Sequence, residues 1–169
     1  MCALARKRWL AFNRFLADLW AAAGDSREIG FSYFGLLLMR DALECDRTVP
    51  ESESDVEEYG PRDLLVETAS IWVNNAGEKM YHSKQTWDDK GGHPEADAQA
   101  LGRGGPRWSG ANGYCPERWS LWKQVFSEVA GDSGSRQNAV TAAKVSFHSI
   151  YLFCFIKYLL LPFRLRSPR

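Results

Sequence analysis

The sequence predicts an all-α fold, a single irregular bundle of about five helices joined by long polar loops. Three observations predict it. Apolar residues recur at steps of three and four in separate stretches, which is the spacing of one helix face. Proline, glycine and acidic residues mark the boundaries of these stretches, and no stretch shows a clear strand pattern. The 169 residues, of which 45% are hydrophobic and 25% charged, are enough to bury one core without disulfides or metal.

The first two helices are predicted on either side of Gly24. In the first, Asn13 falls away from the apolar stripe, and the helix ends near the glycine. Asp25 and Glu28 have the spacing of a capping box, which opens the second helix. That helix has apolar residues on nearly every side through Leu43, so we expect it to be central and mostly buried. The stripe of the first helix consists of Trp9, Phe12, Leu16, Leu19, Trp20 and Ala23.

An acidic loop and a third helix are predicted next. Residues 46–60 contain ESESDVEE, which is too acidic and too poor in apolar groups for a core, so we expect a solvated loop. Pro61 suits the first helical turn, Asp63 complements the helix dipole, and Gly77 is placed as the C-terminal cap. The predicted buried positions of this helix are Leu64, Leu65, Thr68, Ala69, Ile71, Trp72 and Ala76.

Residues 83–114 are predicted to form a long, mobile, glycine-rich loop. The stretch KGGHPEADAQALGRGGPRWSGANG has no sustained period of either kind, and its composition favours disorder. Loops of this length are uncommon in compact domains unless they are functional or disordered.

The fourth helix is predicted to begin at Pro116 and to end at Gly131. Because successive helical residues point about 100° apart, we expect Arg118 to face solvent beside an inward Trp119. A last helix is expected from about Arg136 through Ala143, which completes a helical domain over residues 1–144. The apolar face of the fourth helix consists of Trp119, Trp122, Val125, Phe126 and Val129.

Residues 145–169 form an atypical hydrophobic tail with three competing interpretations. Residues 145–163 nearly reach the length of a membrane anchor, with arginines beyond them, although Lys157 opposes insertion. A last core helix is the second interpretation, but apolar residues on all sides leave no clean polar face. The third is an error in the gene model, because Val-Ser at 145–146 can be encoded by GTAAGT, a common splice-donor hexamer. We favour the third interpretation.

Charge and cysteine content exclude some function classes. The 21 basic residues equal the 21 acidic ones, so no global field attracts nucleic acid, and we expect no nucleic-acid partner. The four cysteines show no zinc or disulfide spacing, so we expect them to be reduced. With no signal-peptide core at the N-terminus, we expect a cytosolic or nuclear protein; a membrane would be reached only through residues 145–163.

Several motifs suggest chemistry, but only weakly. The sequence GDSGS at 131–135 resembles the nucleophile loop of chymotrypsin-like proteases, yet the helical pattern contradicts that fold, so we interpret it as a polar turn. The glycines of GRGGPRWSGANG lack the phosphate-loop pattern. A metal could be held by His82, Asp88, Asp89 and His93, but no two of them share a helix face. We therefore assign no catalytic, cofactor-binding or metal-ligating residue.

Neighbouring arginine and tryptophan residues occur at positions 8 and 9, 107 and 108, and 118 and 119. Such pairs stack on bases or sugars in single-strand binders. Helical phase points two of the three tryptophans inward, so we favour core packing and single out Trp108, in the loop, as the exception. Because truncating a buried tryptophan costs about 3–5 kcal/mol, we interpret Trp72, Trp119 and Trp122 as structural residues first.

Four segments carry a resemblance to a known family. Their order is RWLAFNRFLADLW, LLLMRDALE, ETASIWVNNAGEKMY and ERWSLWKQVF, and it resembles a fungus-restricted family of all-helical proteins classified as a domain of unknown function. The resemblance covers roughly residues 9–143, and its most specific parts surround Trp72 and the segment from Arg118 to Trp122. It implies a helical fold and no catalytic residue or cofactor. Some proteins of this kind are encoded beside fungal secondary-metabolite genes.

The sequence therefore favours a small, non-catalytic helical accessory or interaction protein whose partner is another protein or a pathway enzyme. The alternatives are a small enzyme with an aromatic-lined helical pocket, and a tail-anchored membrane protein. A cavity with convergent polar groups between helices would favour the enzyme, whereas an exposed apolar patch would favour the interaction protein.

Overall fold

The computed structural model describes residues 2–23, 28–46, 52–53, 56, 61–87, 102–132, 137–146 and 148. Its named helices are α1 (Ala3–Ala22), α2 (Glu28–Leu43), α4 (Arg62–His82) and α5 (Pro116–Gly131). Residues 137–146 are also helical, where the last helix was expected. Across these ranges the only β feature is an isolated antiparallel bridge between Thr86 and Gly113. The predicted all-α fold is confirmed.

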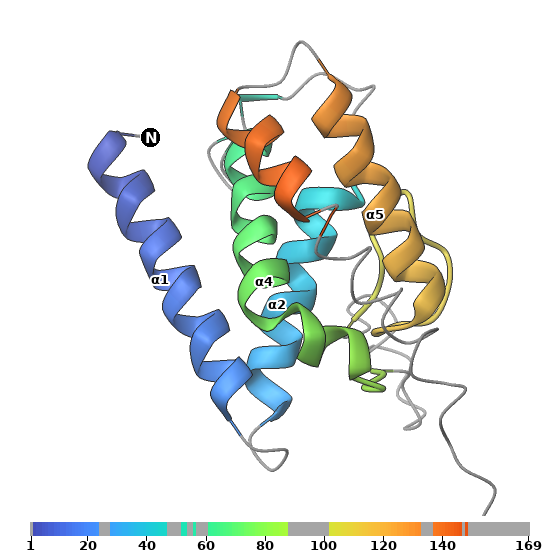
Figure 1. Ribbon diagram of the computed structural model, residues 1–169. Helices are drawn as coiled ribbons and strands as arrows, with labels where there is room; N and C mark the ends of the chain where they lie inside the picture. Colours follow the sequence, from blue (N-terminus) through green and yellow to red (C-terminus); the bar gives the residue numbers. More distant parts are fainter. Residues whose placement is uncertain are drawn as a thin grey trace, which may run out of the picture.

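Helix α2 is the central element of the bundle. It contacts α1, α4 and α5, and its residues Leu36, Met39 and Leu43 are fully buried, as the sequence predicted. Figure 1 shows α1 at one edge of the molecule and α5 at the opposite edge, with α4 and α2 between them. The helical segment 137–146 packs on α4, where the Ser70 hydroxyl donates a hydrogen bond to the Ala142 carbonyl (3.1 Å).

Aromatic rings from three helices and one loop form a continuous chain through the core. The ring centroids of Trp72 and Trp20 are 6.0 Å apart, and Tyr114 lies 6.2 Å from Trp20 and 6.1 Å from Trp122. Trp119 and Trp122 meet edge to face at 5.1 Å. Aromatic pairs at such separations add about 0.5–1.5 kcal/mol to the effect of burial. The structural interpretation of Trp72, Trp119 and Trp122 is confirmed, because each is at most 2% exposed.

The buried side of α1 differs from the predicted stripe. Its buried residues are Asn13, Ala17 and Trp20, while Phe12 and Leu19 are exposed. The physical reason is the indole of Trp72, whose Nε1 donates to the Asn13 Oδ1 atom at 3.0 Å. A buried N–H needs an acceptor, so α1 turns Asn13 inward and Phe12 outward.

Helix α4 extends beyond its predicted end. Gly77 was expected to cap the helix, but it lies buried inside, and the helix continues to His82. A helical glycine costs about 1 kcal/mol relative to alanine, and contacts beyond it offset that cost. Met80 is fully buried, and Tyr81 packs edge-on against Trp119 at 5.6 Å. The Lys79 ammonium donates to the carbonyls of Trp20 and Ala23, which places a cation at the negative end of α1.

Two predicted regions fall largely outside the described residues. In the acidic loop 46–60, the structure describes Asp46, Ser52, Glu53 and Val56, and of these Glu53 and Val56 are helical. Of the tail, residues 145, 146 and 148 are described, so its three interpretations stay predictions. No helix in the described part of the chain is both long and apolar enough to cross a membrane.

Two glycines of α2 give a matched test of how tightly the core is packed. A β-carbon on Gly35 would lie 2.9 Å from the buried ring of Trp72, whereas nothing lies within 4 Å of one on Gly30. We expect Gly35→Ala to lower the free energy of unfolding by about 1–3 kcal/mol through overpacking. Gly30→Ala should raise it by up to about 1 kcal/mol through helix propensity. Urea unfolding followed by circular dichroism measures both, and a stabilising Gly35→Ala would contradict this packing.

Candidate functional site

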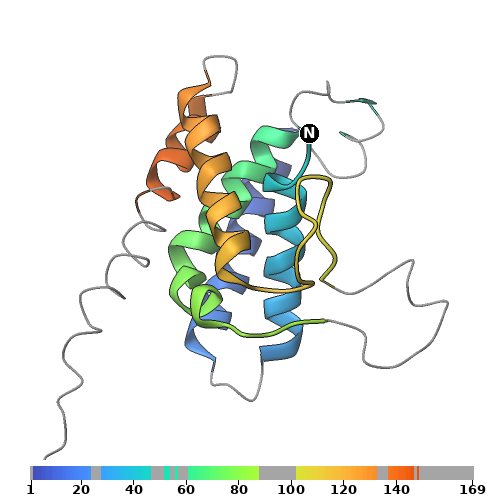
Figure 2. The same cartoon turned by 90° about the vertical axis from the view of Figure 1, so that its right-hand side faces the viewer.

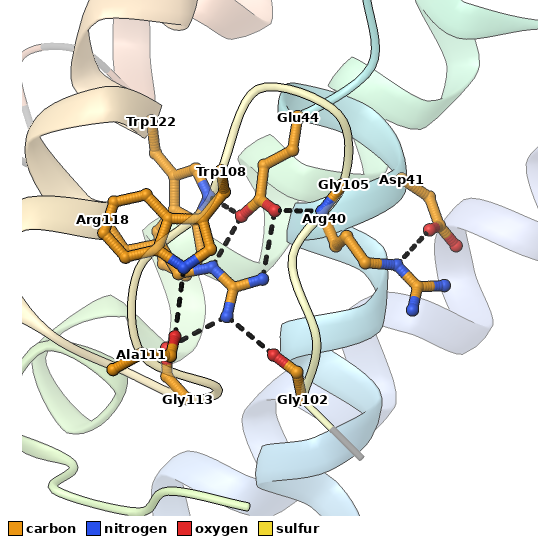
Figure 3. A network of polar contacts seen from close by, with 10 residues as sticks. All are labelled: Arg40, Asp41, Glu44, Gly102, Gly105, Trp108, Ala111, Gly113, Arg118 and Trp122. Carbon is orange, nitrogen blue, oxygen red and sulfur yellow. Dashed lines mark hydrogen bonds and ion pairs between the residues drawn. The ribbon is translucent and has the colours of Figure 1, made fainter. Parts of the chain in front are cut away.

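The most extensive polar network of the described structure is centred on Glu44 and Arg118 (Figure 3). Glu44 follows the last residue of α2, and Arg118 lies in the first turn of α5. The Arg118 Nε atom donates to Glu44 Oε1 at 2.6 Å, and its Nη2 atom donates to Oε2 at 3.0 Å. This two-point geometry matches the planar guanidinium to the planar carboxylate and makes the pair both strong and directional.

Both charges are sealed from solvent and have further partners. The side chains of Glu44 and Arg118 are 0% exposed. The Glu44 carboxylate also accepts from Trp122 Nε1 (2.8 Å) and from the Gly105 backbone N–H (2.7 Å). The Trp108 and Trp122 rings lie 5.7 and 5.6 Å from the guanidinium carbon, close enough for cation–π attraction. An enclosed ion pair needs such partners, because desolvation otherwise exceeds the Coulomb attraction.

The Glu44–Arg118 pair holds the segment 102–114 against the helices. Arg118 Nη1 donates to the carbonyls of Gly102 (2.9 Å) and Gly113 (3.0 Å). The Glu44 carbonyl accepts from the Arg107 backbone N–H at 3.0 Å. The prediction of a mobile loop is therefore wrong for these residues, because they supply the hydrogen bonds that two buried charges require. In Figure 2 this segment runs beside α2 and α5.

Glycine is required at two points of this segment. A β-carbon on Gly105 would lie 2.8 Å from the Glu44 β-carbon, so only glycine lets the backbone N–H approach the carboxylate. Gly102 has a φ of 80°, in the left-handed region that glycine adopts at no steric cost. The glycine richness that suggested disorder is thus used for close backbone approach.

Residues 83–87 close the base of the same segment. The Trp87 N–H donates to the Asn112 carbonyl (2.7 Å), and the Tyr114 N–H donates to the Gln85 carbonyl (3.2 Å). The Tyr114 hydroxyl donates to the Ser32 carbonyl of α2 at 2.8 Å. Burial raises the pKa of Tyr114 well above its ordinary value, so the hydroxyl stays protonated and keeps this bond.

The prediction that Arg118 faces solvent is wrong, and the sequence held a signal that was missed. Arg118 precedes Trp122, Val125 and Val129 by steps of four, three and four, so it belongs to the buried stripe as well. Its partner Glu44 stands at the end of an otherwise apolar helix. The helical phase of Arg118 relative to Trp119 alone predicts exposure, whereas its spacing of four residues from Trp122 places it on the buried side of α5.

Most of the other sequence motifs are dispersed in the structure. His82 is exposed at the end of α4 and lies edge-on to Tyr81 at 5.4 Å; its proposed metal partners Asp88, Asp89 and His93 lie outside the described residues. Among the residues that are described, no group of three or more potential metal ligands occurs. Of residues 131–135, Gly131 and Asp132 are described. Cys2, Cys45 and Cys115 are free thiols, and Cys154 lies outside the described ranges.

The three arginine–tryptophan neighbours have three different roles. Trp9 is partly buried and donates from Nε1 to the Thr68 hydroxyl at 2.9 Å. Trp119 is buried in the core. Trp108, singled out from the sequence as the exception, covers the Arg118 guanidinium and donates to the Ala111 carbonyl at 3.0 Å. Trp108 therefore supports the ion pair.

An open groove lies between α1, α4 and the segment 137–146. Its volume is about 440 Å³. Two arginines, Arg6 and Arg14, line one side, and Arg6 donates to the Glu67 carboxylate across it. The rest of the lining is mostly amide, hydroxyl and aliphatic, from residues including Leu10, Ile71, Asn74, Asn75, Asn138, Thr141 and Val145. These groups are suited to hold a small polar or anionic molecule.

A second surface feature is the side of α1 that points away from the core. We define the outer face of α1 by four exposed side chains, Leu4, Phe12, Phe15 and Leu19, which are 42–61% exposed. Their spacing of eight, three and four residues places them on one side of the helix. The described residues contain one other exposed large hydrophobic side chain, Val145. Several large apolar side chains exposed on one side of a helix are candidates for an interaction site.

The fold and the buried ion pair define a small helical-bundle protein whose connecting loop is fixed by an internal salt bridge. Residues 2–126 match the family described as "Protein of unknown function (DUF3632)", and the chain belongs to this family. The resemblance to a family of unknown function is thereby confirmed, with a match that begins before Trp9 and ends within α5. No curated protein and no solved structure matches the chain.

The buried pair and an exposed pair of the same chemistry provide a matched stability test. Arg118→Met leaves the Glu44 carboxylate unpaired in a dry site, so we expect the free energy of unfolding to fall by about 3–5 kcal/mol. The control is Arg107→Met, which removes the partly exposed pair of Arg107 with Glu128 (2.9 and 3.1 Å) and should cost less than about 1 kcal/mol. Urea unfolding followed by tryptophan fluorescence compares them. Equal losses would show that the buried Glu44–Arg118 pair contributes no more to the free energy of unfolding than the exposed pair does.

Proposed function

We propose that this chain is a non-catalytic helical interaction protein that docks its partner on the outer face of α1. The observation that carries the proposal is the placement of Leu4, Phe12, Phe15 and Leu19 on the side of α1 opposite its buried residues. Burying such side chains in an interface is favourable by about 1.5–3 kcal/mol each. Leaving these side chains exposed gives the monomer no comparable gain in free energy.

The core of the chain supports the same interpretation. The charged groups at the centre of the polar network, Glu44 and Arg118, contact each other and backbone groups, and neither is exposed to solvent. These groups stabilise the bundle and cannot touch a substrate. Apart from the residues that line the open groove, the part of α1 left to contact another molecule is its apolar outer side.

The groove between α1 and α4 is where the alternative function, a small enzyme, would have its site. Its arginine and amide lining supports binding of a polar molecule. Within the lining, the Glu67 carboxylate is engaged by Arg6. We rank this alternative second because part of the groove lining is already occupied by the ion pair of Arg6 with Glu67, whereas no such pair occupies the outer face of α1 within the described structure.

We place the interaction within a fungal biosynthetic pathway, on the strength of the family resemblance. Deleting the gene should then change the metabolite profile, and the wild-type gene should restore it. A Phe12→Ser/Phe15→Ser variant should fail to restore the profile although it folds, since both changes are at exposed positions. An unchanged metabolome in the deletion strain would count against the pathway setting. The expected cytosolic or nuclear location stays a prediction.

Site-specific photo-crosslinking tests the docking surface directly. With p-benzoylphenylalanine in place of Phe15, irradiation of cells should give a covalent adduct at one defined mass, since Phe15 lies at the centre of the outer face. The matched control carries the same amino acid at Ser120, an exposed position on α5, and should give no adduct. The adduct partner is identified by mass spectrometry and its binding is rebuilt from purified proteins with wild type and Phe15→Ser. Equal adducts at both positions, or none at position 15, would overturn the proposal.

A further inference from the structure

We propose that the partner of the outer face of α1 is a second copy of this chain, packed antiparallel about a two-fold axis. The inference rests on the proposed function, in which this side of α1 is a docking surface. It adds the identity of the occupant and the register of the contact.

The inference starts from a seam that runs the length of α1. We define the α1 seam as the positions that follow Leu4 at alternating steps of four and three. Every one of them is exposed, and the steps are those of a two-helix coiled-coil contact. Helix α1 packs its other side on α4 and α2, and Figure 1 shows it at the edge of the molecule. The seam consists of Leu4, Arg8, Ala11, Phe15, Asp18 and Ala22.

The seam is complementary to itself when two copies run antiparallel. In one register, Ala11 lies opposite Phe15 of the second copy, and Leu4 lies opposite its Ala22. Each large side chain therefore meets a small one, which is how facing helices fill space without voids. The same register places Arg8 opposite Asp18 of the second copy, and the two-fold axis generates each contact twice.

The charges select the antiparallel arrangement over the parallel one. Two parallel helices in register would place Arg8 against Arg8 and Asp18 against Asp18, and would pair Phe15 with Phe15 and Ala11 with Ala11. Like charges across a contact are repulsive, and aligned helix dipoles are less favourable than opposed ones. Asp18 also accepts a hydrogen bond from Asn75 of α4 within its own chain (2.5 Å), which joins its carboxylate to α4 at the edge of the seam.

The remaining apolar residues of the outer face flank the same contact. Phe12 and Leu19 lie on the same side of the seam, and an antiparallel two-fold pair brings each side of the seam against the same side of the second copy, so Phe12 lies near Phe12 of the second copy and Leu19 near its Ala5. These contacts bury further apolar surface, and the aromatic pair adds its own attraction. Because the chain has no net charge, no long-range repulsion keeps two copies apart.

A lipid surface is the main competitor for a helix with exposed leucine, phenylalanine and basic residues. Asp18 argues against it, because the carboxylate lies on the seam that a bilayer would have to bury, where no cation would be opposite. A second copy supplies that cation from Arg8. We therefore favour the second copy, and a vesicle assay is included in the test.

The test is a charge exchange across the contact, measured by sedimentation velocity on the full chain. A contact of one helix of about 30 Å per copy is at the small end of stable interfaces, so we expect a dissociation constant on the order of micromolar. Arg8→Glu places two acids opposite each other, and Asp18→Arg places two bases, so each should raise that constant by about tenfold or more. An equimolar mixture of the two variants should form a heterodimer, because both contacts then pair an acid with a base. Lys144→Glu, an exposed change on the segment 137–146, should have no effect.

The outcomes separate this inference from the proposed function. If Asp18→Arg does not fold, Ala11→Glu tests the same contact by placing a carboxylate against Phe15 of the second copy. A monomer at all concentrations, or a dimer indifferent to Arg8→Glu and Ala11→Glu, would overturn the second copy as occupant. So would a monomer that floats with phosphatidylserine vesicles in a Phe15-dependent way. A monomer whose position 15 crosslinks to a different protein would overturn the dimer alone and leave the docking surface standing.

Discussion

The buried ion pair between Glu44 and Arg118 is the constraint on which the rest of the bundle depends. It joins the end of α2 to the start of α5 across 74 residues of sequence, and it draws in the backbone of residues 102–113 as further donors and acceptors. Since two desolvated charges are tolerated only with such partners, the position of the loop, the glycines that permit it and the two stacked indoles all follow from this one contact. The tryptophan-rich core supplies most of the burial, and the ion pair fixes which loop closes over it.

Polar groups play a similar role on the other side of the bundle, where α1 meets α4. Asn13 accepts from Trp72 and donates to the Trp9 carbonyl, while Trp9 reaches Thr68. These bonds set the rotation of α1 about its axis. Once Asn13 faces inward, Phe12, Phe15 and Leu19 must face outward, because positions on a helix rotate together. The exposed apolar side of α1 is thus a direct consequence of a buried asparagine, and it is the feature from which we infer docking.

The sequence was sufficient to predict the helices, but it was insufficient to predict the polar contacts between them. Sequence pattern predicted all five of these helical segments, and the central α2 and the buried Trp72, Trp119 and Trp122 followed from the apolar pattern alone. The apolar pattern places Asn13 off the stripe of α1, and the phase relative to Trp119 places Arg118 toward solvent, whereas the hydrogen-bonding needs of Trp72 and Glu44 bury both residues. Residues 102–114 were interpreted as disordered for a related reason. Their order comes from two charges distant in sequence, which no local composition can reveal.

The two central contacts of this protein have separable physical consequences. The Glu44–Arg118 pair is sealed in the core between α2 and α5, whereas the α1 seam lies at the opposite edge of the molecule. A change in the pair alters the balance between folded and unfolded chains and should leave an independent surface equilibrium alone, because distant sites usually contribute additively. In the proposed dimer, a change in the seam alters association and affects stability only through the mass action of the dimer. Both features lie within residues 2–126, the part that matches the family, so the matched region contains the ion pair that holds the bundle together and the surface on which we propose that a partner binds.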